Sequence, residues 1–181
     1  MNVIQLRSAI PSDAPALGAV HVASWHETYT GILPDEMLAS LSVEARTEMW
    51  TKILGYPAAF GGTAVYVAED HGRVVGFGSC GQQRDEALTG LGFGGEISAI
   101  YVLRSHQRLS VGRSIMRAMA HALLEQGRAA ATLWVLRENV VARGFYERLG
   151  GAVVSEKKDE MPRTTLVELA YGWGDLSLLA R

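Results

Sequence analysis

The 181-residue chain predicts an α+β fold, built on a mixed, mostly antiparallel sheet of about seven strands with four or five helices. Two observations lead to this prediction. Short apolar or alternating runs joined by turn residues occur toward both ends of the chain, and they indicate antiparallel hairpins. Near the middle, one amphipathic helical stretch separates two apolar strands, which indicates a parallel crossover.

The first third of the chain predicts one strand followed by helices. Residues 3–7, "VIQLR", alternate apolar and polar side chains as a half-buried strand does. The next segment predicts a helix that Asp13 caps and that runs to about Tyr29. Residues 34–54 show near-helical apolar spacing with an interruption at 41–43, which predicts two short helices.

The middle of the chain predicts a hairpin, a loop and a further strand. Residues 64–68 and 74–80 are apolar, β-branched runs joined across turn residues, so they form an antiparallel hairpin. Residues 82–95, "QQRDEALTGLGFGG", have no period and several glycines, and we interpret them as a mobile loop. The run "EISAIYVL", residues 96–103, predicts a strand.

The last third predicts two helices among three strands. Residues 110–126 place Val111, Ile115, Met119 and Leu123 at four-residue intervals, which gives an apolar stripe suited to packing on a sheet. The remaining elements are a strand, a short helix and two strands: 130–136, 139–150, 151–156 and 164–172.

Charge and cysteine content narrow the class of partner. A formal charge of −2 and a pI near 6.2 give no general attraction for nucleic acid or an anionic membrane, so small molecules are the expected partners. Cys80 is the one cysteine, which excludes an internal disulfide and a cysteine-rich metal site. The first residues lack a signal-peptide pattern and no segment is long enough to span a membrane, so we expect a cytoplasmic protein.

The segment "SHQRLSVGRSIM", residues 105–116, joins a strand to a helix and predicts an anion site. It matches neither the P-loop nor the dinucleotide glycine pattern, which disfavours a nucleotide-binding switch. The first amides of the helix would still attract an anion, and Gly112 would let a phosphate approach the backbone. Arg104, Arg108 and Arg113 could add charge there. A capped helix start is the alternative.

A second segment, "LWVLRENVVARGFYERLGG", places a short helix directly after an apolar strand. Together the two segments resemble the GCN5-related N-acetyltransferase (GNAT) family. Gln107 and Gly112 match the first family motif, in which Ser110 stands where a glycine is usual. The second motif is matched by Asn139, Ala142, Tyr146 and Gly150, whereas Gly151 replaces the usual phenylalanine.

The resemblance implies a three-layer fold with a central, splayed pair of parallel strands. It implies one acetyltransferase domain over residues 1–181, with 171–181 as a C-terminal tail. The implied reaction is acetyl transfer from acetyl-CoA to a primary amine of a small molecule or peptide, by direct attack in a ternary complex and with no metal. An alternative on the same fold is a non-catalytic acyl-CoA sensor or interaction module.

For acetyl-CoA, the resemblance implies a pyrophosphate clamp and a strand that binds the pantetheine arm. Serine at position 110 would cost energy if that backbone needs a positive φ, although its hydroxyl could instead donate to phosphate or cap the helix. Asn139 resembles the residue that contacts the arm, with a helix cap as the alternative. The implied cofactor-binding residues are Ile100, Tyr101, Val102, Gln107, Arg108, Leu109, Ser110, Val111, Gly112, Arg113 and Asn139.

For catalysis, the resemblance implies Tyr146 as the acid that protonates the departing thiolate, because an unperturbed phenol is protonated at neutral pH. The alternative is a ring that only fills the core. Glu96 matches the family's glutamate that removes the amine proton, often through water, although it could equally be a solvated strand end. Trp134 stands where enzymes that acetylate ribosomal-protein N-termini carry a glutamate, which disfavours that subgroup.

The acceptor side is implied by "SWHETYTGILP", which resembles the N-terminal segment of many bacterial members. Trp25, His26 and Tyr29 could line the acceptor pocket, and His26 or Glu27 could serve as alternative bases. A lone histidine on an aromatic-rich helix is more often a packing residue. Residues 89–95 could form the opposite wall or a lid. The tail covers a sheet edge, joins a homodimer interface or folds back on its own domain.

Overall fold

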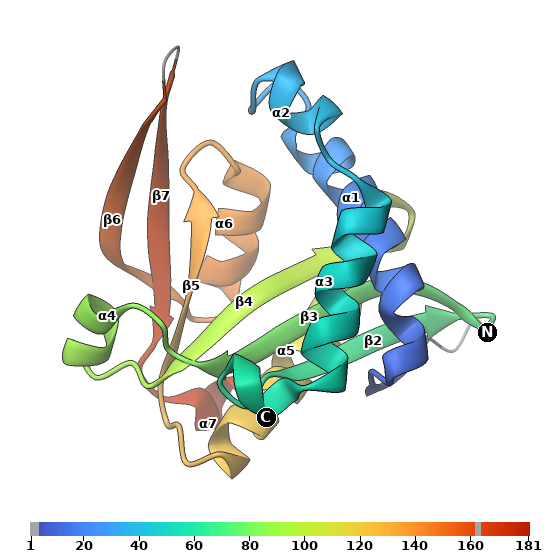
Figure 1. Ribbon diagram of the computed structural model, residues 1–181. Coiled ribbons are helices and arrows are strands. Elements are labelled where there is room, and N and C mark those ends of the chain that lie inside the picture. The colour runs from blue at the N-terminus through green and yellow to red at the C-terminus, as the bar shows by residue number, and fades with distance from the viewer. Residues whose placement is uncertain (1–3, 162–163) are drawn as a thin grey trace.

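The computed structural model describes residues 4–161 and 164–181, and Figure 1 shows its arrangement. The described residues form a seven-stranded sheet in the order β1-β2-β3-β4-β5-β7-β6. The strands are β1 Gln5–Ser8, β2 Ala64–Asp70, β3 Arg73–Gln82, β4 Gly95–Val102, β5 Ala131–Leu136, β6 Ala152–Met161 and β7 Thr164–Trp173. The helices are α1 Ala14–Tyr29, α2 Asp35–Ala39, α3 Val43–Gly55, α4 Glu86–Gly90, α5 Val111–Glu125, α6 Val140–Arg148 and α7 Leu176–Leu179.

Neighbouring strands are antiparallel except for β4 and β5, which are parallel and joined by the crossover helix α5. Within the described residues, β4 and β5 pair at two positions, Gly95 with Ala131 and Glu96 with Thr132. Beyond these positions the two strands diverge (Figure 1), and β5 pairs along its whole length with β7 instead. The predicted mixed sheet with a splayed parallel pair is confirmed.

A β-bulge lies on β4 at the start of this divergence. Ser79 of β3 pairs with Ala99 and the next residue, Cys80, pairs with Ile97, so Ser98 is the additional residue. Its hydroxyl lies 2.7 Å from the Ser79 hydroxyl. Because a bulge bends its strand and increases the local twist, this one turns β4 away from β5 just after their last shared pair.

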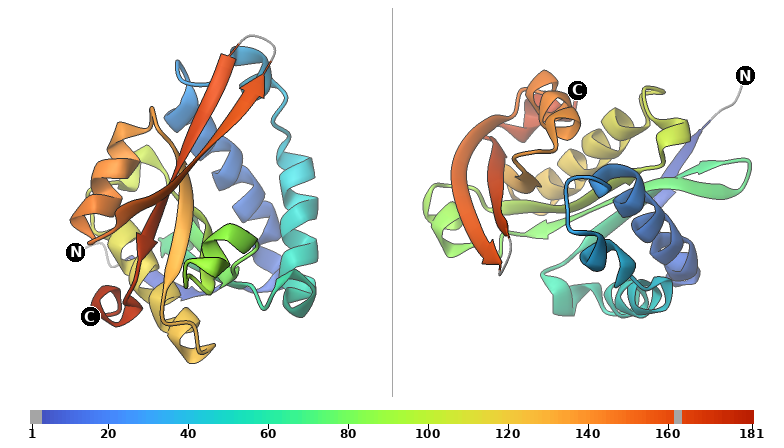
Figure 2. Two further views of the ribbon diagram at one scale, coloured as in Figure 1. Left: turned by 90° about the vertical axis from the view of Figure 1, so that its left-hand side faces the viewer. Right: turned by 90° about the horizontal axis from the view of Figure 1, so that it is seen from above.

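Helices cover both faces of the sheet, and Figure 2 shows the resulting three layers from above. On one face α1 and α3 bury Leu17, Trp50 and Phe77. On the other face α5 buries the stripe that the sequence predicts, in which Ile115, Met119 and Leu123 are fully buried. Alternate residues of β4 therefore contact different layers: Ile100 and Val102 pack toward α5, whereas Ala99 and Tyr101 pack toward α1 and α3.

The close approach of α1 and α3 depends on Gly18. A Cβ atom at this position would lie 2.4 Å from the Thr47 hydroxyl and 2.9 Å from the Thr47 backbone nitrogen. Because the second of these atoms belongs to the backbone of α3, a larger side chain would push the two helices apart. This contact fixes the helix pair that carries the aromatic residues described below.

The start of α1 differs from the prediction that Asp13 caps it. The Asp13 carboxylate makes no cap bond with α1 and instead binds the Arg7 guanidinium, at 2.7 Å and 2.9 Å, and accepts the Ile10 N–H at 2.8 Å. Arg7 in turn binds Glu69 of β2. The hydrogen bonds from Arg7 lower the pKa of Asp13. Because Arg7 belongs to the edge strand β1, the same bonds connect the start of α1 to the edge of the sheet.

The prediction of an irregular loop over residues 82–95 is wrong in part. The strand β3 continues to Gln82, and α4 follows directly. Asp85 caps that helix by accepting the N–H groups of Ala87 and Leu88, and the Leu88 side chain is 1 % exposed. A cap and one buried leucine stabilise a turn of helix too short to show a period.

The C-terminal tail folds back on its own domain, which was one of the three alternatives. Its predicted start at 171 is wrong because β7 continues to Trp173. Asp175 then caps α7, whose Leu176 and Leu179 are buried in the core beneath α5. The Arg117 side chain of α5 donates to the Ala180 carbonyl at 3.0 Å.

The structure bears on two expectations from composition. Cys80 is fully buried, and burial raises the pKa of its thiol to about 12, so it is an inert packing residue as expected. Across the helices of residues 4–161 and 164–181, none combines the length and the apolar character that crossing a bilayer requires.

The packing of α7 predicts a large difference between two neighbouring leucines. Leu176→Ala should lower the free energy of unfolding by about 3 kcal/mol, because it leaves a cavity in the core. Leu178, which is 61 % exposed, is the matched control, and its change to alanine should cost less than about 0.5 kcal/mol. Urea denaturation of both variants measures the difference, and equal losses would contradict the docking of α7.

Candidate active site

The turn between β4 and α5 presents a row of free backbone amides. Arg108 and Ser110 both have positive φ, 61° and 65°, on either side of Leu109. Such alternation of backbone handedness turns successive N–H groups toward one side and makes a concave anion site. Among the described residues, the amides from 108 to 113 have no hydrogen-bond acceptor, and the first amide of α5 with a helical partner is that of Ser114. We call residues 108–113 the amide nest.

Two side chains hold the turn in this shape. The Gln107 amide donates to the Val102 carbonyl at 3.0 Å, which closes the turn onto the end of β4. The Arg104 N–H donates to the Glu27 carboxylate at 2.7 Å, and the Arg104 guanidinium donates to the Glu27 carbonyl, so α1 is tied to the same turn. Arg104 and Gln107 are therefore engaged within the protein, whereas Arg108 and Arg113 are exposed and make no side-chain bond to any described residue.

The two motif positions inside the nest, Ser110 and Gly112, have different structural roles. Ser110 is the residue before α5, and it adopts the left-handed conformation that costs a non-glycine residue roughly 1–2 kcal/mol. Its hydroxyl makes no cap bond with the described chain. At Gly112 a Cβ atom would lie 3.1 Å from the Phe145 ring, so the glycine allows α5 to contact α6. A glycine at position 112 therefore has a role in helix packing, besides the close approach of a phosphate that the sequence predicts.

The side chains flanking the nest differ in burial. Val111 is 4 % exposed and anchors the first turn of α5 in the core, whereas Leu109 is 58 % exposed. On β4, Ile100 and Val102 face the α5 layer, and the backbone from Ile97 onward has no strand partner on the β5 side within the described sheet. A short turn, residues 103–107, connects this open strand edge to the nest.

Three tyrosine hydroxyls lie near one another beside the divergence: those of Tyr29 on α1, Tyr101 on β4 and Tyr146 on α6. The Tyr146 ring is 6 % exposed and packs near Tyr171 and Trp173, so it is a core residue. Burial raises its pKa well above that of a free phenol, and the neighbouring tyrosines raise it further. Tyr146 therefore stays protonated, as its predicted role requires.

Asn139 caps α6, which was the alternative interpretation of this residue. Its side-chain oxygen accepts the Ala142 N–H at 3.2 Å, and it is 8 % exposed. Burial raises the pKa of the Tyr29 hydroxyl, and a hydrogen bond with the Asn139 side chain opposes that shift. The cap thus joins the start of α6 to the end of α1.

An aromatic cluster lies between α1, α3 and the sheet. We use this name for five residues: His21, Trp25, Trp50, Phe77 and Tyr101. The His21 ring stacks on Tyr101 with ring centres 4.8 Å apart and planes 26° apart. The Trp50 indole donates to His21 Nδ1 at 3.3 Å, and the Trp25 indole donates to the Tyr101 hydroxyl at 2.9 Å.

His21 is held neutral in this cluster. Burial lowers its pKa to about 4, and the nearby Arg46 guanidinium contributes in the same direction. Since Nδ1 accepts the Trp50 proton, the imidazole proton is on Nε2. The sequence prediction named His26, which is exposed, and missed His21. The signal was present, because His21, Trp25 and Tyr29 follow one another at four-residue intervals on one helix face.

Both carboxylates proposed as bases are bound by N–H donors. Glu96 is 8 % exposed, and Arg84 donates to its two oxygens at 2.9 Å and 2.5 Å from the side chain and at 3.2 Å from the backbone. Glu27 accepts the Arg104 amide described above. Sequence reasoning missed Arg84, which belongs to the segment assigned to a mobile loop and anchors that segment to the start of β4.

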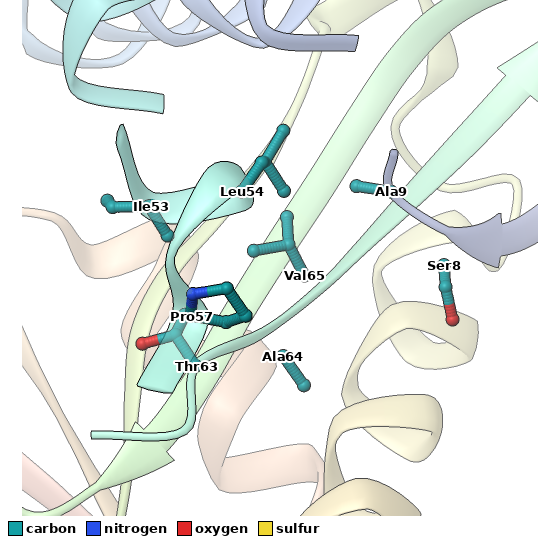
Figure 3. A pocket seen from close by; sticks show the side chains of 8 residues that line it. All are labelled: Ser8, Ala9, Ile53, Leu54, Pro57, Thr63, Ala64 and Val65. Atoms are coloured by element: carbon teal, nitrogen blue, oxygen red, sulfur yellow. The ribbon is translucent and has the colours of Figure 1, made fainter. Parts of the chain in front are cut away.

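A shallow pocket near β1 and β2 (Figure 3) lies away from the tyrosines, and its lining residues are Ser8, Ala9, Ile53, Leu54, Pro57, Thr63, Ala64 and Val65. In the described ranges, no group of three or more His, Cys, Asp or Glu side chains could hold a metal ion.

Comparison with known proteins assigns the chain to a family. The model of the acetyltransferase (GNAT) family matches residues 23–151. A Bacillus subtilis (strain 168) protein described as the uncharacterized N-acetyltransferase YuaI is 34% identical over 179 residues, covering 98% of this chain and 96% of that protein.

Two solved structures share the fold. The PaiA N-acetyltransferase of Thermoplasma acidophilum in complex with coenzyme A is 18% identical, with a TM-score of 0.73, and covers 92% of this chain and 98% of its own. The YncA putative acetyltransferase of Salmonella typhimurium with its cofactor acetyl-CoA is 16% identical, with a TM-score of 0.70. The match covers 96% of this chain and 94% of that protein.

The buried neutral His21 predicts that stability falls with decreasing pH. The unfolded chain binds a proton at this imidazole below about pH 6.5, whereas the folded protein does so only near pH 4. Between these values the unfolded state binds more protons, so acid lowers the free energy of unfolding. From pH 7.5 to pH 5 this one group should account for about 2 kcal/mol.

The test compares the protein with His21→Asn by urea denaturation at the two pH values. Asparagine offers an acceptor for the Trp50 indole but does not titrate, so the variant should lose about 2 kcal/mol less on acidification. An identical loss in both proteins would show that His21 is not the group responsible.

Proposed function

The chain belongs to the acetyltransferase (GNAT) family, and on that premise we propose that it transfers an acetyl group from acetyl-CoA to a primary amine of a small molecule or peptide, by direct attack in a ternary complex. The single observation that supports this most is the amide nest at residues 108–113, which follows the unpaired edge of β4 after one short turn. This arrangement suits a long ligand with a diphosphate at one end and an amide-containing arm at the other.

In this proposal the nest binds the pyrophosphate of the co-substrate. Its amides and the positive end of the α5 dipole favour an anion, and the exposed Arg108 and Arg113 side chains add charge. The backbone of Ile100, Tyr101 and Val102 hydrogen-bonds the pantetheine arm in place of the missing β5 partner, and Asn139 flanks that arm. That coenzyme A and acetyl-CoA occupy the two structural relatives supports this assignment.

The acyl carbonyl requires hydrogen-bond donors that are already oriented. We assign this role to backbone N–H groups of β4 close to the bulge at Ser98, where the strand leaves β5. Donors fixed in a folded strand need no reorganisation when negative charge develops on the oxygen, which is why such groups lower barriers effectively.

Tyr146 supplies the proton for the leaving thiolate. As the new C–N bond forms and the C–S bond breaks, the sulfur gains an electron pair, and a neutral donor nearby can protonate it. The raised pKa of Tyr146 keeps its phenol protonated over the physiological range. Burial of the ring among Tyr171 and Trp173 fixes its direction, so its core position and its catalytic role are compatible.

Glu96 receives the proton that the amine loses, through a water molecule. It lies on β4 at the last position paired with β5, which is the closed end of the divergence. Arg84 retains one carboxylate oxygen while the other accepts the proton. The acceptor itself lies against Trp25, Tyr29 and Tyr101, with His26 at the exposed rim.

The proposal predicts that Tyr146→Phe separates binding from turnover. The variant should release coenzyme A from acetyl-CoA about 100-fold more slowly in the presence of an accepted amine, because it lacks the acidic proton. Acetyl-CoA should still raise its melting temperature as it does for the unchanged protein. Tyr56→Phe, at a tyrosine that is 71 % exposed, is the matched control and should leave both quantities unchanged.

The outcomes distinguish the parts of the proposal. No rise in melting temperature at millimolar acetyl-CoA would overturn the co-substrate assignment. Binding without turnover on a broad panel of amines would favour the acyl-CoA sensor. Unchanged turnover in Tyr146→Phe would remove Tyr146 as the acid and leave the reaction in place.

A further inference from the structure

Arg46 on α3 is a half-buried cation without an anionic partner. Of its five N–H groups, one lies 3.9 Å from the sulfur of Met49, which is a weak acceptor. Among the residues that the structure describes, no carboxylate oxygen lies within 4.0 Å of its guanidinium. Partial burial of a guanidinium costs free energy unless its N–H donors have acceptors. A bound anion would supply the acceptors that Arg46 lacks.

The position of Arg46 connects it with the acceptor side of the site. Its guanidinium carbon lies 5.8 Å from the centre of the Trp25 ring, within the range of a cation–π contact. Trp25 in turn donates to the Tyr101 hydroxyl. The charge of Arg46 also lowers the pKa of both His21 and Tyr101, which places it next to the aromatic cluster.

Three carboxylates near this region already have partners. Glu27 accepts the Arg104 amide, and Glu96 is bound by Arg84 at both oxygens. Glu168, which lies near Tyr29, pairs with Lys157 at 3.0 Å. These three carboxylates are thus matched, whereas Arg46 has no carboxylate partner within the described chain.

We propose that Arg46 binds a carboxylate of the acceptor, so that the substrate class is a primary amine that also carries a carboxylate, such as a free amino acid. This inference rests on the proposed acetyl transfer. An arginine recognises a carboxylate through two parallel N–H···O bonds, which fix orientation as well as provide attraction. Because Trp25 lies under the Arg46 guanidinium and donates to the Tyr101 hydroxyl of β4, a carboxylate bound at Arg46 lies on the acceptor side of the proposed site.

The same charge disfavours cationic acceptors. A diamine such as putrescine would bring its second ammonium group toward Arg46, and like charges in a partly desolvated site repel strongly. The inference therefore predicts a ranking, with amino acids acetylated better than their neutral amides and diamines acetylated worst.

The test compares L-amino acids with their C-terminal amides, using thiol release from acetyl-CoA by the full chain and by Arg46→Gln. The amine of an amide differs in intrinsic reactivity from that of the acid, so the readout is the acid-to-amide ratio of kcat/KM in each protein. We expect the unchanged protein to show a ratio roughly 10- to 100-fold higher than Arg46→Gln, the range of one charged hydrogen-bonded contact.

Two controls accompany this comparison. Arg73→Gln removes an exposed arginine at the start of β3 and should leave the ratio unchanged. The melting temperature of Arg46→Gln, and its rise with acetyl-CoA, should match those of the unchanged protein, which shows that the variant is folded. Equal acid-to-amide ratios in all three proteins, with amines acetylated, would overturn the role of Arg46 and leave the proposed function intact. Absence of acetylation of every amine would overturn both.

Discussion

The early end of the β4–β5 ladder is the constraint on which the rest of the site depends. Two parallel strands that pair at Gly95 and Glu96 and then separate leave the polar backbone of β4 without its usual partner. Unpaired backbone groups in a sheet interior are costly, so a fold that retains them must supply an alternative partner. The bulge at Ser98 and the full pairing of β5 with β7 hold the strands apart, which makes the opening a fixed feature of the fold.

Burial, more than neighbouring charge, sets the protonation states of the side chains around this opening. Tyr29, Tyr101 and Tyr146 stay neutral because burial disfavours the phenolate, and His21 stays neutral because burial disfavours the imidazolium. A surface of neutral hydrogen-bonding groups suits a reaction in which the attacking amine must be uncharged. Arg46, next to these groups, is then the feature that discriminates among amines by charge.

The sequence predicted the parts of the fold that a local period encodes. The hairpin, the stripe of α5 and the parallel crossover follow from spacing alone, and the two motif segments located the nest and Tyr146. The short helices α4 and α7 were missed because each depends on one aspartate cap and one or two buried leucines. The structure also explains Gly151, which stands where the family motif has phenylalanine. A Cβ atom at this position would lie 2.7 Å from the Trp173 ring.

Contacts between distant segments could not be predicted in the same way. The Trp50 indole that binds His21 lies 29 residues away, and Arg84, which binds the Glu96 carboxylate, lies in a segment without a period. No pattern within one segment shows that Asp13 binds Arg7 rather than capping α1, or that Arg104 binds Glu27 rather than adding charge at the amide nest. Such pairings depend on which elements the fold brings together.

In the proposed function, coenzyme A binds along the unpaired edge of β4 and ends in the amide nest. Titration of the ¹⁵N-labelled protein with coenzyme A, followed by amide chemical shifts, tests this claim residue by residue. We expect the largest changes at residues 97–102 and 108–113, with little change around the pocket near β1 and β2. Large changes confined to other regions, or none at residues 108–113 under saturating ligand, would contradict it.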